Sequence, residues 1–158
     1  MRKGLSLVEL LVVIVIIGIL SAMLILSSAE SSASAKASNI ISDMTNIKIA
    51  ALAYLVDHDD EIDKKGTGFD LNKASADVMK YLDKGTVNAY SKYQLVNSKK
   101  RGAEDEWYVW YNVTDGRVKK KLASRAESLQ LLGADGVSNN PGGNIYNKGK
   151  AYVGMQIY

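Results

Sequence analysis

The sequence predicts an α+β fold in which one long N-terminal helix carries a small antiparallel β-sheet head with two short helices. Three observations lead to this fold class. An apolar run of nearly bilayer length opens the chain, a helical pattern continues it without Gly or Pro, and alternating aromatic and β-branched residues follow in the second half. The first half of the helix is expected to lie in a membrane and its second half on the head.

The helical signal runs from the N-terminus to an end between residues 56 and 60. Residues 10–26 are an uninterrupted apolar core, and residues 27–38 are rich in Ser and Ala, which let neighbouring helices approach closely. Apolar residues then recur at steps of four and three, which is one helical face: Ile40, Met44, Ile47, Ala51 and Leu55. Such a helix would be about 80 Å long. Lipid or further copies must therefore cover its first half, because the head is too small to do so.

Weaker signals place the elements of the head. A helix is expected at residues 72–83, from Asn72 as N-cap to a stop at Gly85, and another at residues 119–132, ending at Gly133. Strands are expected at residues 90–96, 106–114 and 151–158, with turns at 115–116 and 148–149. The residues expected to fill the core are Ala74, Val78, Leu82, Trp107, Tyr111, Leu122, Ala126, Leu129 and Tyr152.

Composition excludes some classes of function. The chain has 158 residues and 17.2 kDa, enough for one modest domain plus an extended element. It has no Cys, which excludes thiol redox chemistry and thiolate metal sites. The net charge is only +3, and removal of Arg2 and Lys3 would reduce it. Bulk charge therefore implies neither a nucleic-acid nor an acidic partner.

Glu9 is the most informative residue, because it is a carboxylate about one turn inside the apolar run. A charge at the centre of a bilayer span costs about 3 kcal/mol, and less toward the ends, so such residues are usually functional. A cut after Gly4 would create an amino terminus at Leu5, about one helical turn from Glu9. That amine is the cation which the carboxylate lacks.

These residues carry a family resemblance. Basic Arg2 and Lys3, then Gly4, the sequence LSLVEL and an apolar helix with Gly18 resemble the class III leader of type IV pilins and type II secretion pseudopilins. The resemblance is close over residues 1–26, looser to about residue 56 and only architectural beyond. Leu5 stands where the family more often has Phe. Leu26 stands where many members have a helix-bending Pro, so a straighter, more continuous helix is expected.

The resemblance implies a structural subunit, not an enzyme, that polymerises through its N-terminal helix into a type IV pilus or type II secretion pseudopilus. Residues 1–4 would be a removed leader, 5–28 the transmembrane and polymerisation helix, 29–60 its amphipathic continuation and 61–158 the head. Cleavage would fall between Gly4 and Leu5, with N-methylation at Leu5. Glu9 would serve assembly, and Gly18 would serve helix packing.

The resemblance also implies partners and a location. The partners are other copies, related minor pilins, a prepilin peptidase, an inner-membrane platform protein, an assembly ATPase and, before assembly, membrane lipid. The chain would cross the inner membrane once, with its head outside the cytoplasm, and then join a periplasmic or cell-surface filament. Pilus, secretion pseudopilus and competence pilus stay open, as do major and minor subunit.

Two other interpretations of the N-terminus remain. One is a secretory signal peptide cleaved at residues 27–29, which gives a secreted protein. The other is a plain anchor for an extracytoplasmic binding module that does not polymerise. Neither interpretation explains Glu9 or Gly4, so the pilin-like leader is favoured.

Other clusters of polar residues are better explained as solvent-exposed surface than as functional sites. The acidic residues 57–63 lack the Gly that a calcium loop needs at its sixth position, and residues 135–144 offer a single carboxylate, so no metal or cofactor is expected. His58 is expected to be an exposed loop residue. Lys and Arg near Tyr108 and Trp110 could hold DNA, but a solvated helix face is favoured and nucleic acid is not expected. These basic residues are Arg117, Lys119, Lys120, Lys121 and Arg125.

Overall fold

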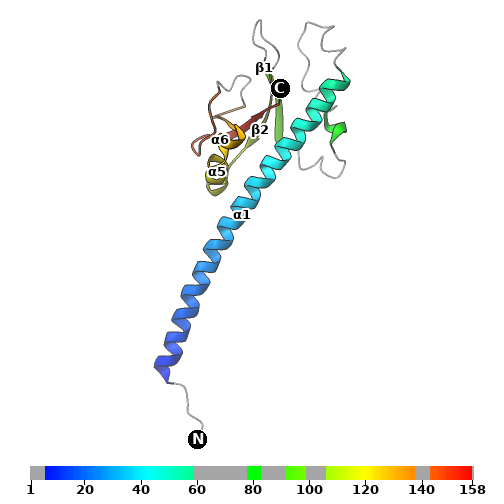
Figure 1. Ribbon diagram of the computed structural model, residues 1–158. Coiled ribbons are helices and arrows are strands. Elements are labelled where there is room, and N and C mark those ends of the chain that lie inside the picture. The colour runs from blue at the N-terminus through cyan, green and yellow to red at the C-terminus, as the bar shows by residue number, and fades with distance from the viewer. Residues whose placement is uncertain (1–5, 59–77, 83–91, 99–105, 138–142, 158) are drawn as a thin grey trace.

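The computed structural model describes residues 6–58, 78–82, 92–98, 106–137 and 143–157. Its shape is a long shaft with a small head set beside the C-terminal half (Figure 1). The shaft is α1, Leu7–Asp57, a helix of 51 residues without a break. The continuity that Leu26 predicts is thus confirmed, since a Pro at this position would remove a backbone hydrogen bond. The α+β fold class is confirmed as well.

The end of α1 lies within the predicted range, at Asp57. His58 closes the helix, because its backbone N–H donates to the carbonyl of Tyr54 over 3.1 Å. The His58 ring stacks on the Tyr54 ring with centroids 4.1 Å apart. The prediction of an exposed loop His is therefore wrong: His58 is a half-buried helix cap.

One face of the C-terminal half of α1 packs on the head. Its buried residues follow one another at steps of four and three, with Ala50 added: Ala33, Ala37, Ile40, Met44, Ile47, Ala50, Ala51 and Tyr54. Four of the five residues predicted for this face are buried. The fifth, Leu55, is half-buried, and Tyr54 takes the core position beside it. Burial begins only at Ala33, so the first half of α1 contributes nothing to the core.

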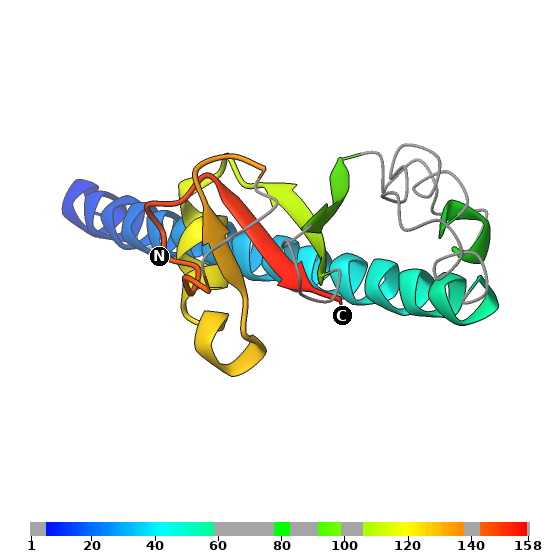
Figure 2. The ribbon, with the colours of Figure 1, turned by 90° about the horizontal axis from the view of Figure 1, so that it is seen from above.

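Four antiparallel strands form the sheet that covers this face of α1 (Figure 2). Their order is β1-β2-β4-β3. The strands are β1 (Tyr93–Ser98), β2 (Glu106–Asn112), β3 (Leu132–Ala134) and β4 (Tyr152–Gln156). The three predicted strands are confirmed with shorter or shifted bounds, and β3 was not predicted.

The predicted helix at residues 119–132 is wrong in its bounds. The chain instead forms α5 (Gly116–Ala123) and α6 (Ala126–Leu129). Asp115 caps α5 by accepting from the N–H of Arg117 over 2.9 Å, so residues 115–116 begin a helix instead of making a hairpin turn. Gln130, at φ 51°, ends α6 in the left-handed region. The chain then enters β3, which leaves Leu129 41% exposed.

Strand β2 is buried on both faces. Trp107 and Val109 belong to the core under α1, while Tyr108 and Trp110 form a second cluster on the opposite face. Trp110 lies flat against Gly154 of β4, where a Cβ would meet the indole ring at 2.5 Å. Of the other predicted core aromatics, Tyr111 and Tyr152 are half-buried.

A short 3₁₀ helix, η1 (Met79–Tyr81), lies inside the segment predicted as the first short helix of the head. Val78 and Leu82 flank it and are buried, as predicted. The hydroxyl of Tyr81 donates to Asp57 over 2.8 Å, which ties this segment to the end of α1. Residues 72–77, which include Ala74, lie outside the described part of the chain.

Candidate functional site

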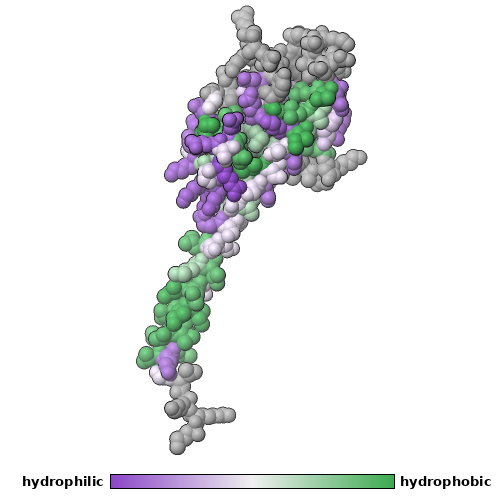
Figure 3. Space-filling model, in the orientation of Figure 1, coloured by the Kyte–Doolittle hydropathy of each residue, from purple (hydrophilic) through white to green (hydrophobic). Residues whose placement is uncertain are grey.

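The first half of α1 is an exposed apolar shaft. Residues 7–26 contain one ionisable side chain, Glu9, and every residue from 6 to 28 is exposed. Figure 3 shows this apolar surface along the visible side of the shaft below the head. Twenty helical residues extend about 30 Å, the thickness of a bilayer's hydrocarbon core. By length and composition, α1 is the one helix in the described residues that could cross a membrane.

A capping box builds the start of the shaft. Ser6 is extended, at φ −67° and ψ 145°, and its hydroxyl oxygen accepts from the N–H of Val8 over 3.2 Å. The carboxylate of Glu9 reaches back and accepts from the N–H of Ser6 over 2.8 Å. Two N–H groups that the helix would leave without partners are thereby satisfied. Ser6 had not been predicted as a site residue, although the pattern Ser-x-x-Glu could have identified it.

The capping box thus fixes the orientation of the Glu9 side chain. Its contact with Ser6 aims the carboxylate at the N-terminal end of α1, where a negative charge also complements the helix dipole. Glu9 remains exposed, and a carboxylate has more lone pairs than this single hydrogen bond uses. The arrangement can therefore accept a cation at the start of the shaft. Gly4 and Leu5 lie outside the described residues.

Gly18 lies in the middle of the shaft. A Cβ built there would meet no atom within 4 Å, so nothing in the isolated chain requires Gly. Gly inside a helix costs about 1 kcal/mol relative to Ala. Any benefit that offsets this cost must come from a surface outside the chain, which is compatible with the predicted role in helix packing.

A second polar region, which sequence reasoning did not assemble, lies where α5 meets α1. Lys121 Nζ is 2.9 Å from Glu30 Oε2, and Lys36 Nζ is 4.0 Å from Asp115 Oδ2. The guanidinium of Arg125 donates to the hydroxyls of Ser38 and Ser34 over 2.8 and 3.4 Å.

The surroundings of two carboxylates in this region, Glu30 and Asp115, lower their pKa values. The hydrogen bond from Lys121 lowers the pKa of Glu30, and the charges of Lys121, Lys120 and Arg117 lower it further. The N–H of Arg117 lowers the pKa of Asp115. Both carboxylates stay ionised at neutral pH. The Ser-rich stretch of α1 was predicted as a close-packing surface, yet it also supplies hydroxyl acceptors to the head.

The acidic run at 57–63 and the loop at 135–144 lie partly outside the described residues, and their described carboxylates make separate contacts. Asp135 pairs with Lys150 over 2.7 Å, and Asp57 accepts from Tyr81. Within the described residues no three His, Cys, Asp or Glu side chains gather as a metal site would require. Most of the acidic run after Asp57 lies outside those residues. Tyr108 and Trp110 are buried and so offer no open ring beside the basic residues of α5.

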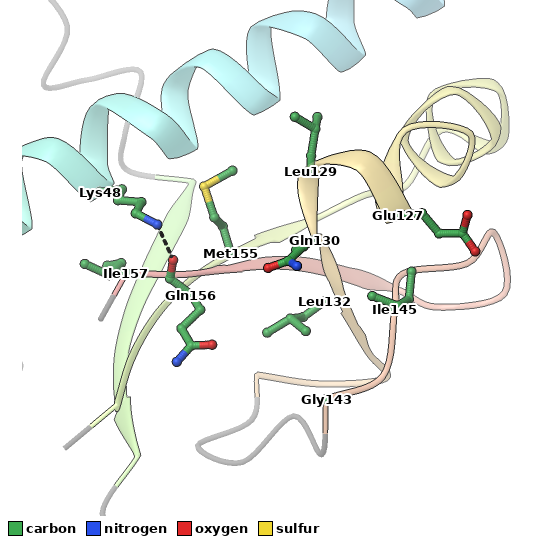
Figure 4. Close-up of a pocket in the computed structure, with 10 residues that line it drawn as sticks. All are labelled: Lys48, Glu127, Leu129, Gln130, Leu132, Gly143, Ile145, Met155, Gln156 and Ile157. Carbon is green, nitrogen blue, oxygen red and sulfur yellow. Dashed lines mark hydrogen bonds between the residues drawn. The ribbon is translucent and has the colours of Figure 1, made fainter. Parts of the chain in front are cut away.

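An open hollow of about 550 Å³ lies between α1, α6 and β4 (Figure 4). Its lining mixes polar and apolar side chains, with Lys48 and Glu127 at opposite sides. The ammonium of Lys48 is already engaged, since it donates to the backbone carbonyl of Gln156 over 3.0 Å. The described residues that line the hollow include no paired nucleophile and base.

Comparison with known proteins identifies the N-terminal segment. Residues 1–25 match the family model of the prokaryotic N-terminal methylation motif, which covers Gly4, Leu5, Glu9 and Gly18. No curated protein and no solved structure matches the chain. The motif and the apolar helix together indicate a structural, pilin-like protein held in a membrane. The chain thus begins with the class III prepilin leader of type IV pilins and pseudopilins.

Proposed function

We propose that this protein is a subunit that polymerises through α1 into a type IV pilus or a type II secretion pseudopilus. One observation carries the proposal: an exposed apolar shaft bears a methylation motif at its tip and a polar head at its other end. An apolar surface of this size needs a cover from outside the chain. Lipid provides that cover before assembly, and the shafts of other copies provide it afterwards.

Processing prepares the tip of the shaft. Arg2 and Lys3 stay on the cytoplasmic side, in keeping with the positive-inside rule. A prepilin peptidase cuts between Gly4 and Leu5 and methylates the Leu5 amine. The peptidase has room for no side chain before the scissile bond, and only Gly has no Cβ. Residues 1–4 then leave, and the tip of the shaft carries a cationic amine.

Glu9 selects the register of assembly. In a growing filament the Leu5 amine of an incoming subunit meets Glu9 of its neighbour among apolar side chains. Leaving either charge buried and unpaired costs about 3–5 kcal/mol, which is ample to favour the one register that pairs both. The capping box supports this role, because it holds the Glu9 carboxylate at the end of the helix where that amine arrives.

Filament growth follows from the geometry of the subunit. A shaft leaves the bilayer only if neighbouring shafts replace the lipid around it, which is the close packing that Gly18 serves. A head-to-tail contact that does not close produces a helical filament instead of a ring. The assembly ATPase and the platform protein supply the work of extraction from the inner membrane, and related minor pilins join the same filament.

Two substitutions at Glu9 separate its charge from its role as a cap. Glu9→Gln removes the charge, yet Gln at this position still completes a capping box. Glu9→Val removes both. Both variants should insert and be cleaved but form no homopolymer when filaments are counted by electron microscopy. Glu127→Gln, on the exposed surface of the head, is the matched control and should assemble normally. Normal filaments from Glu9→Gln would contradict the pairing mechanism.

A non-polymerising binding module is the second candidate, and the open hollow beside Lys48 favours it. The mass of the N-terminal peptide of the mature protein distinguishes the candidates. A subunit begins at Leu5 and carries one added methyl group. A plain membrane anchor begins at Met1, and a secreted protein begins at Glu30. Either of these last two results would rule out the proposed function.

A further inference from the structure

The lower edge of the head, next to the shaft, is positively charged. Figure 3 shows hydrophilic side chains gathered there, and Figure 1 places α5 at this edge. We call this surface the basal face. It is formed by five cationic and two acidic residues: Lys36, Arg117, Lys120, Lys121, Arg125, Glu30 and Asp115. The excess of cations is local, because Asp43 and Asp57 lie farther along α1.

Contacts with α1 fix the height of the basal face above the membrane. Lys121 pairs with Glu30, and Arg125 reaches Ser38. Glu30 and Ser38 follow the last residue of the apolar run, Leu26, by about 6 and 18 Å along the helix axis. The head-group zone is about 5–8 Å thick, and the field of a charged surface extends a further ~8 Å at physiological salt. The end of the basal face at Glu30 and Lys121 therefore lies within the field of the leaflet from which α1 emerges, and the end at Ser38 and Arg125 lies just beyond it.

Two of its cations remain available for a partner. Lys121 is held by Glu30 and Arg125 by serine hydroxyls. Arg117 and Lys120 are exposed and make no ion pair with another described residue. Both lie near Glu30, since their charges lower its pKa, and Glu30 is the acidic residue of the basal face nearest to the apolar run.

We propose that the basal face docks on anionic phospholipid head groups and holds the head against the bilayer before assembly. The inference rests on the membrane stage of the proposed function, but not on polymerisation. Docking needs only a tilt of α1 toward α5, because the helix is continuous through the boundary and carries the head with it. Assembly would then have to break these contacts, which makes lipid charge a determinant of when a subunit leaves the membrane.

Lipid fits the basal face better than DNA does. Single-stranded nucleic acid is held by aromatic rings that stack on bases as well as by charge. Tyr108 and Trp110 are 4% and 0% exposed, and Tyr111, the ring nearest to these cations in sequence, is half-buried. A flat array of cations beside a membrane span needs no such rings, and it already lies next to a charged surface.

The test uses the full chain in nanodiscs. The chain has no Cys, so Thr114→Cys places a single fluorescent label on an exposed residue next to Asp115. Lipids with a quencher on the head group then report how often the basal face touches the bilayer. Nanodiscs of phosphatidylcholine alone are compared with nanodiscs that also contain phosphatidylglycerol. Quenching should be stronger with phosphatidylglycerol and should fall as salt is added.

Charge variants decide the outcome. Each cation near an anionic surface is worth about fivefold, so Arg117→Gln with Lys120→Gln should lower the ratio of docked to lifted heads about 25-fold. The matched pair Arg117→Lys with Lys120→Arg keeps both charges and should dock normally. Equal quenching in both lipids by inserted chains would overturn docking and leave the pilin proposal intact. Chains that fail to insert would overturn both proposals. Binding of added DNA, with no response to phosphatidylglycerol, would assign the surface to nucleic acid.

Discussion

The two halves of α1 belong to one unbroken helix, yet they have opposite surroundings. From residue 6 to residue 28 every side chain is exposed. From Ala33 to Tyr54 a single stripe is buried against the head, and the remaining faces are mostly polar, with Ile49 as an exposed apolar residue. A helix that is apolar on every side must be covered on every side, whereas a helix with one apolar stripe needs one covering surface. The comparison shows that the shaft depends on surfaces outside the chain and the stripe on the head.

Two methionines test this comparison most strongly. Met44 is fully buried in the stripe, and Met23 is 64% exposed on the shaft. Met44→Ala should destabilise the head by about 2–5 kcal/mol, because it leaves a cavity in a packed core. Met23→Ala should leave head stability unchanged. Denaturant unfolding of the full chain in nanodiscs, followed by the fluorescence of the two buried Trp, measures both. Equal losses would show that the shaft and the head unfold together.

The next largest difference between the head and the shaft is expected at high pH, where the head should unfold first. Burial raises the pKa of Tyr146 to about 12. Burial, together with the hydrogen bond to Glu106, raises the pKa of Tyr108 to about 12. An unfolded chain ionises Tyr near pH 10, so this contribution to stability is complete below pH 10 and is lost as pH rises toward 12. Absorbance of tyrosinate and circular dichroism should show the head unfolding in this window while the α1 shaft stays helical. Unfolding complete below pH 10 would contradict the assignment.

Substitution of one glycine in the head and one in the shaft should give smaller but distinct effects. Gly154→Ala places a Cβ against the indole of Trp110 and should cost about 1–3 kcal/mol of head stability. Gly18→Ala meets no atom and should cost the isolated chain nothing. If Gly18 serves packing between shafts, its substitution should act on filament yield alone. The same unfolding assay and a count of filaments distinguish these outcomes.

Removal of the two helix N-caps should give the smallest effects, one confined to the head and the other to the start of the shaft. Asp115→Ala should lower head stability by about 1 kcal/mol, because α5 loses its N-cap. Ser6→Ala should release only the first turn of the shaft. Hydrogen exchange resolved by residue measures both. Faster exchange of head amides in Ser6→Ala would contradict the independence of the two halves.

Sequence periodicity was sufficient for the parts of the fold with long, regular patterns. The unbroken helix, its buried face and strand β2 are confirmed because each depends on many residues in phase. The helix predicted at residues 119–132 breaks after Ala123 and ends at Gln130, where a left-handed residue turns the chain into β3. Nothing in the pattern marks that turn, since Gln rarely adopts such a conformation. His58 was misassigned because its stacking on Tyr54 depends on the helix continuing to Asp57.

The candidate site was predictable in its residues but not in its contacts. Glu9 and Gly18 stand out because each is costly where it lies. The capping box with Ser6 is local and could have been predicted from a spacing of three residues. The basal face could not have been predicted, because Glu30 meets Lys121 and Ser38 meets Arg125 across 91 and 87 positions of the chain. Such contacts depend on how the head docks against α1.

The continuity of α1 also has a mechanical consequence. A helix with a kink can straighten under load and so absorbs extension before its ends feel the force. Leu26 allows an unbroken helix through the junction between shaft and head, so a pull at the tip passes directly to the stripe from Ala33 to Tyr54. The subunit is therefore stiff along its length. In an assembly of such subunits, elastic extension would have to come from sliding between neighbouring shafts.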